Sequence, residues 1–185
     1  MNIVSISGSP SLRSRSAWLL QLAQTRLEAS AARSTFISVR ELPAAALLVA
    51  DTLSEPIRRA LAQVAEADLV IVATPIYKAA YSGVLKLFLD LLPPEALRGK
   101  TVLPLATGGS LAHLLALDYA LKPVLSALGA RDILDGVFAT DSQLAPHESG
   151  GYVPDRVLVE RIDRALQPLP ILRAGDRLTV LGSAA

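Results

Sequence analysis

The sequence contains no cysteine and only two histidines among its 185 residues. The absence of cysteine excludes disulfides, thiolate metal sites and a cysteine nucleophile. His113 and His147 are too few for a histidine-rich metal site, so we expect no metal. A large net charge is also absent, because the sequence has 18 lysines and arginines and 17 aspartates and glutamates, which gives a formal net charge of +1. Proteins that bind nucleic acid need a strong positive excess, so we expect no nucleic-acid partner.

Long uncharged apolar runs are absent too, although the sequence is 51% hydrophobic. The longest candidate, residues 103–128, is interrupted by His113, Asp118, Lys122 and Pro123. This pattern does not predict a membrane span. No basic and apolar signal segment precedes the first apolar run, which favours a cytoplasmic protein without a membrane partner. The apolar excess must therefore go into a core and into subunit contacts.

Short apolar runs alternate with helical patterns along the chain. The apolar runs predict strands at residues 2–7, 35–39, 69–73, 102–106 and 133–138. Helical spacing predicts helices at residues 14–30, from Ser54 onward, and at 82–92, 111–128 and 155–166. This alternation predicts an α/β flavodoxin-like fold, a five-stranded parallel sheet in the order 2-1-3-4-5 with helices on both faces. We expect one domain over residues 1–167, a polar loop at 140–153, and a C-terminal tail over residues 168–185.

The loop after the first predicted strand, residues 7–16, is rich in serine and also contains Gly8, Arg13 and Arg15. It leads into a helix, whose free N–H groups and partial positive charge bind anions. Hydroxyls of Ser9, Ser14 and Ser16 and the arginine side chains add donors. The loop has no G-x-G-x-x-G pattern. An ordinary strand-to-helix turn with a serine cap would show the same residues, so the loop alone leaves both interpretations open.

Two further loops follow the third and fourth predicted strands. The first carries Pro75, Ile76 and Tyr77, and the second carries Thr107, Gly108 and Gly109. The carboxyl ends of parallel strands meet at one edge, so all three loops are expected there. The glycines allow backbone to approach a ligand closely, and the other loop offers an apolar shelf. A phosphate site beside a site for a flat ring fits FMN, although a plain turn and a half-buried surface tyrosine remain alternatives.

Four segments resemble the NADPH-dependent FMN reductase family. They are ATPIYKAAYSG at 73–83, LPLATGG at 103–109, AHLL at 112–115 and DYALKPVLSAL at 118–128. Within that family, the last segment is similar to the FMN reductases of two-component alkanesulfonate monooxygenase systems. The resemblance covers the chain from its first strand to about Gln143.

This resemblance implies reduction of FMN by NADPH, with the reduced FMN passed to a partner monooxygenase that desulfonates alkanesulfonates. The phosphate contacts of the family correspond to Ser9, Ser14, Arg15 and Ser16. Its ring contacts correspond to Pro75, Ile76, Tyr77, Thr107, Gly108 and Gly109. Hydride transfer between two cofactors needs no metal and no nucleophile from the protein.

Tyr119 corresponds to the aromatic insertion that marks the sulfonate-linked members of the family. The resemblance implies a π-helical turn there, at the interface of a tetramer built from dimers and near the flavin. We expect Tyr119 to gate flavin release, while a packed interface aromatic is the simpler interpretation of the residue alone. Helices 82–92 and 111–128 are apolar on two sides, which independently favours a homo-oligomer, because one sheet covers only one side.

Two other functions remain open at this point. One is a flavin enzyme that keeps its FMN and reduces a quinone or an azo compound. The other is a flavodoxin-like electron carrier without turnover of its own. The nearly neutral net charge disfavours the carrier, because carriers usually present a charged docking face.

Overall fold

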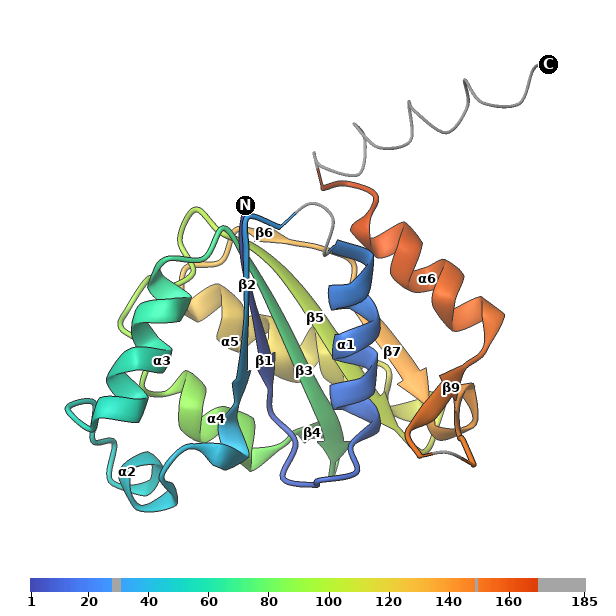
Figure 1. The fold of residues 1–185 in the computed structure, drawn as a ribbon, viewed down its shortest axis with the longest axis horizontal. Coiled ribbons are helices and arrows are strands. Elements are labelled where there is room, and N and C mark those ends of the chain that lie inside the picture. The colour runs from blue at the N-terminus through green and yellow to red at the C-terminus, as the bar shows by residue number, and fades with distance from the viewer. Residues whose placement is uncertain (28–30, 149, 170–185) are drawn as a thin grey trace.

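A parallel sheet forms the centre of the computed structural model, which describes residues 1–27, 31–148 and 150–169 (Figure 1). The strands run in the order β2-β1-β3-β5-β6, with β7 also paired to β5 and the short β4 paired to β3. Their bounds are β1 Asn2–Ser7, β2 Arg33–Ser38, β3 Leu69–Tyr77, β4 Ala80–Tyr81, β5 Thr101–Gly108, β6 Asp132–Ile133 and β7 Val137–Thr140. With β6 and β7 as two halves of the fifth strand, the predicted order and fold class are confirmed.

Helices cover both faces of this sheet (Figure 1). One face carries α2 Ala44–Leu48, α3 Glu55–Ala65, α4 Gly83–Leu89 and α5 Lys122–Ala127. The other carries α1 Arg15–Leu27 and α6 Arg156–Leu166. The predicted first helix continued over residues 28–30, which lie outside the described residues, as do residues 170–185 of the predicted tail. Within the described part of the chain, no helix has the length and apolar character needed to span a membrane.

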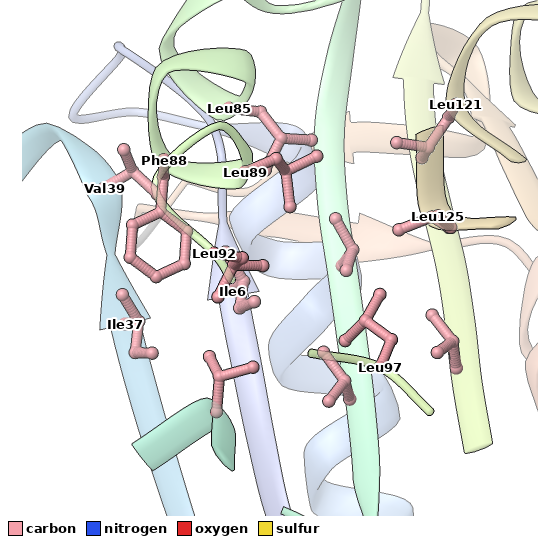
Figure 2. Close-up of a cluster of buried hydrophobic side chains, with 14 of the residues drawn as sticks. Ile6, Ile37, Val39, Leu85, Phe88, Leu89, Leu92, Leu97, Leu121 and Leu125 are labelled. Carbon is pink, nitrogen blue, oxygen red and sulfur yellow. The ribbon is translucent and has the colours of Figure 1, made fainter. Parts of the chain in front are cut away.

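The core lies in two layers because successive strand residues point to opposite faces. Val4 and Ile6 of β1 belong to the buried cluster that includes α3, α4 and α5, whereas Ile3 belongs to the cluster that includes α1 and α6. Figure 2 shows part of the first layer, where Leu85, Phe88 and Leu89 of α4 point toward the sheet. Residues 69–74 of β3 are all buried, as expected of a central parallel strand.

The fifth predicted strand, residues 133–138, is wrong as a continuous element. Thr101 of β5 pairs with Asp132, and Leu105 pairs with Val137, so the partner strand contains one extra residue between these pairs. Such an extra residue is a β-bulge. Pro104 lies in the intervening part of β5 and has no N–H to donate to the ladder, which accounts for the interruption.

The predicted helix at residues 111–128 is also wrong as a continuous α-helix. It consists of a 3₁₀ turn at Leu111–His113, a π-helix at Leu117–Leu121, and α5. Pro123 lacks the N–H that a continuous α-helix would donate to the carbonyl of Tyr119, so the hydrogen-bond ladder must change there. The π-helical turn expected around Tyr119 is confirmed.

A two-stranded hairpin replaces the polar loop predicted at residues 140–153, which is a further correction. A 3₁₀ turn at Asp141–Gln143 leads into β8 Leu144–Pro146, which pairs antiparallel with β9 Tyr152–Pro154. Gly150 and Gly151 have φ of 94° and 80°, and this left-handed backbone allows the chain to reverse between the strands.

Candidate functional site

The three unusual loops meet at the carboxyl edge of the sheet, which is the lower edge in Figure 1. Together they line an open cleft of about 220 Å³. Every predicted cofactor residue except Ser16 lines this cleft: Ser9, Ser14, Arg15, Pro75, Ile76, Tyr77, Thr107, Gly108 and Gly109. Ser11, Arg13 and Asp141 complete the lining. The structure thus brings the predicted residues together, and their binding roles remain predictions.

The loop after β1 is fixed in place by Gly8. Its N–H donates to the Ala73 carbonyl at 2.8 Å, and its carbonyl accepts a hydrogen bond from the Ser82 hydroxyl. A Cβ at this position would stand 2.5 Å from the Leu85 Cβ, so glycine is required for the close approach to α4. These contacts tie the loop to β3 and α4 and set the position of the α1 N-terminus.

Buried serine hydroxyls shape the start of α1. The Ser14 oxygen accepts from the Ala17 N–H at 3.1 Å, which makes it the helix cap, and it lies 3.0 Å from the Ser16 hydroxyl. Ser9 accepts from the Ser11 N–H at 3.2 Å. The remaining N–H groups of the first helical turn have no intrahelical partner, so they form an anion-binding end beside the cleft. Ser16 does not line the cleft, and its hydroxyl contacts the Ser14 hydroxyl, which does.

Arg15 adds a positive charge beside the start of α1, and its side chain contacts Asp141 and Leu144. Its Nη1 lies 3.7 Å from the Asp141 carboxylate, and its Nε donates to the Leu144 carbonyl at 3.2 Å. A guanidinium has five N–H donors, so these contacts leave donors for an anion. Asp141 follows the last parallel strand at the same sheet edge, and the strand-end rule could have predicted it.

The apolar shelf is part of a strand and not a loop, which corrects the prediction. β3 runs through Pro75 and Ile76 to Tyr77 and turns into β4 at Lys78 and Ala79, with φ of 50° and 63°. Such left-handed turn positions usually hold glycine or asparagine, so this turn is strained. Within the shelf, the Ile76 side chain is buried in the core, and the Tyr77 side chain is 50% exposed.

Hydrogen bonds make the shelf rigid. The Thr74 hydroxyl donates to the Pro75 carbonyl at 2.9 Å and accepts from the Ser82 N–H at 3.0 Å. Burial raises the pKa of the Tyr81 phenol opposite Ile76, with Lys86 lowering it and Asp90 raising it less strongly. Tyr81 therefore stays neutral near pH 7 and adds no negative charge behind the shelf.

The two glycines after β5 differ in their surroundings. A Cβ on Gly108 would stand 3.1 Å from Phe138 and 3.6 Å from the His113 Nδ1, whereas a Cβ on Gly109 would meet nothing within 4 Å. Within residues 1–27, 31–148 and 150–169, the buried Nδ1 of His113 has no hydrogen-bond partner. Three features fit a phosphorylated flat ring such as FMN. They are the open space at Gly109, the unsatisfied polar atom beside Gly108, and the anion-binding end of α1 across the cleft.

Tyr119 does not line the cleft in the single chain. Its side chain is 79% exposed, and its N–H donates to the Leu115 carbonyl at 2.9 Å. Leu111, Leu114 and Leu115 are also exposed, at 62%, 41% and 57%. We call Leu111, Leu114, Leu115 and Tyr119 the apolar patch.

Comparison with known proteins agrees with these features. The family model described as NADPH-dependent FMN reductase matches residues 1–145. An FMN reductase (NADPH) of Pseudomonas putida is 49% identical over 94% of this chain and 89% of its own length. That of Escherichia coli K12 is also 49% identical, over 90% of this chain and 87% of its own. The solved apo form of the NADH:FMN oxidoreductase EMOB has a TM-score of 0.81 and 42% identity, covering 89% of this chain and 86% of that one.

Proposed function

The chain belongs to the NADPH-dependent FMN reductase family, and we propose that it supplies reduced FMN to a separate monooxygenase that desulfonates alkanesulfonates. It is an FMN reductase, and its cofactors are FMN and NADPH. The resemblance of residues 118–128 to the sulfonate-linked members supports the choice of partner. The proposal adds three points to this activity: the reduced flavin is released, a monooxygenase receives it, and that monooxygenase acts on a sulfonate.

The openness of the cleft is the observation that carries the proposal. The cleft has about 220 Å³ in the single chain, and a second cavity of about 620 Å³ adjoins it at Arg13, Ser14 and Arg15. Tyr77 is half exposed and Gly109 is exposed, so the ring side is covered incompletely. A flavin held chiefly by its phosphate and one ring face can leave, as a flavin that serves as substrate must.

Different residues of the cleft would bind the phosphate and the ring of FMN. The first turn of α1, with Ser9, Ser14 and Arg15, would hold the phosphate, with Ser16 supporting Ser14. Pro75, Ile76 and Tyr77 would support one ring face, and the backbone of Thr107, Gly108 and Gly109 would approach its polar edge. Bound FMN supplies the chemistry by accepting a hydride from NADPH. The protein would orient the two, and hydride transfer between them needs no acid or base from the cleft.

Tyr119 is proposed to control flavin release at the interface of a tetramer. Its π-helix and its place in the apolar patch support this role, because π-turns are frequent at functional sites and exposed apolar patches mark interfaces. Tyr119→Ala is expected to purify with bound FMN and to transfer reduced flavin more slowly. Absorbance of the purified variant checks this. A colourless variant with an unchanged transfer rate would refute the role.

Two assays separate the proposal from its rivals. After dialysis, the protein should retain little FMN yet oxidise NADPH rapidly when free FMN is added, and more slowly when a quinone is added. With an FMN-dependent monooxygenase and an alkanesulfonate, it should support sulfite release. Tight retention of FMN with quinone reduction would favour the quinone reductase, and retention with negligible NADPH oxidation would favour the electron carrier.

A further inference from the structure

The β8–β9 hairpin lies against the start of α1, outside the main sheet. A Cβ on Gly151 would overlap the Trp18 ring, so the hairpin backbone packs directly on that side chain. The Trp18 and Tyr152 rings meet edge to face, with centroids 6.4 Å apart and planes at 82°. These contacts fix where β9 lies relative to the phosphate end of the cleft.

Tyr152 contacts the phosphate loop in two ways. The guanidinium carbon of Arg15 lies 4.8 Å from the centre of the Tyr152 ring, which is a cation–π contact. The Tyr152 hydroxyl donates to the Arg13 carbonyl at 3.4 Å. The other hairpin strand provides the Leu144 carbonyl that accepts from Arg15 Nε. One hairpin therefore contacts both the side chain and the backbone of the loop that would hold the phosphate.

The type of contact matters for what Arg15 can still bind. The Tyr152 ring attracts the guanidinium charge through its π face and offers the guanidinium no hydrogen-bond acceptor atom. Nε is directed to Leu144, and the Asp141 carboxylate, 3.7 Å from Nη1, is beyond ordinary hydrogen-bond length. The Tyr152 ring and the Leu144 carbonyl thus hold the guanidinium, and its terminal N–H groups remain available for a phosphate at the cleft wall.

We propose that Tyr152 is a positioning residue for flavin binding, which holds Arg15 ready for the FMN phosphate and so sets the preference for FMN over riboflavin. Riboflavin has the same ring but lacks the phosphate, so it does not use Arg15. The inference rests on the proposed function in one respect, namely that the cleft holds FMN through the end of α1.

Titration of the full chain with FMN and with riboflavin, followed by flavin fluorescence, tests this directly. Tyr152→Leu is expected to weaken FMN binding by about 5- to 30-fold, which corresponds to the upper part of the range for a cation–π contact, and to leave riboflavin binding within about twofold. Tyr152→Phe keeps the ring over Arg15 and should stay near wild type. Val153→Ala changes the exposed neighbour on the same strand and is the matched control.

Each outcome decides a separate point. Equal weakening of FMN and riboflavin by Tyr152→Leu, or no weakening, would overturn the positioning role. If the leucine variant does not fold, Tyr152→Gln retains a polar side chain without an aromatic face, and the same FMN-selective loss is expected. In an Arg15→Gln background, Tyr152→Leu should add little further loss, and a full additional loss would contradict the inference. Wild-type protein that binds both flavins equally would instead refute the proposed phosphate site.

Discussion

Gly109 provides a test of the ring side of the cleft, because its surroundings separate binding from stability. A Cβ there would meet no atom of the chain within 4 Å, and its φ lies outside the left-handed region. Gly109→Ala therefore creates no clash in the free protein, and we expect the exposed position to accept Gly109→Val as well. Reduced freedom of the unfolded chain should leave the unfolding midpoint unchanged or raise it by up to about 4 °C.

The same substitutions should weaken flavin binding, because Gly109 lines the space assigned to the ring. Forcing a side chain into a well-packed contact costs about 1–3 kcal/mol, which corresponds to about 5- to 150-fold in dissociation constant. Valine should have the larger effect, and FMN and riboflavin should be affected alike because both carry the ring. Gly83→Ala, on α4 and also without neighbours within 4 Å, is the matched control. A Gly109→Val protein that folds normally and binds FMN like wild type would refute the ring placement.

Three further substitutions test the loop after β1, the half-buried Lys100 before β5 and the apolar patch. Gly8→Ala should lower the unfolding midpoint by about 2–12 °C in thermal melts, because its Cβ would clash with Leu85 at a cost of about 1–3 kcal/mol, while Gly83→Ala should not. Burial lowers the pKa of Lys100 in the folded protein, so the unfolded protein keeps this proton to a higher pH. The free energy of unfolding should therefore rise with pH just below 10.5. In urea unfolding, this rise should be larger in wild type than in Lys100→Met. Leu115→Glu should reduce the mass seen by light scattering, and an unchanged mass would exclude the apolar patch as the subunit interface.

The order of the sheet and the location of the cleft could be predicted because both follow from local patterns. Apolar runs such as 69–73 identify buried strands, and the strand-end rule then brings distant loops to one edge. That rule placed nine predicted residues in one cleft without knowledge of any contact between them. It would also have pointed to Asp141, which follows β7 at the same edge.

The remaining features depend on partners that lie far away in the sequence. The bulge between β6 and β7 requires knowing that Pro104 would be their neighbour in the sheet. The hairpin at residues 144–154 contains only short strands, and its place is decided by the fit of Gly151 to Trp18. Helical periodicity assumes a regular turn, so it predicted one continuous helix over residues 111–128, which the π-helix at Leu117–Leu121 and Pro123 do not preserve.

Anaerobic titration of the purified protein with NADPH, in the presence of FMN in large excess over the chain, tests the central claim most directly. The account predicts that the visible absorbance of the whole FMN pool is bleached over many turnovers, because flavin enters the open cleft, is reduced and leaves. Bleaching that stops at an amount stoichiometric with the chain, or that does not occur at all, would contradict it.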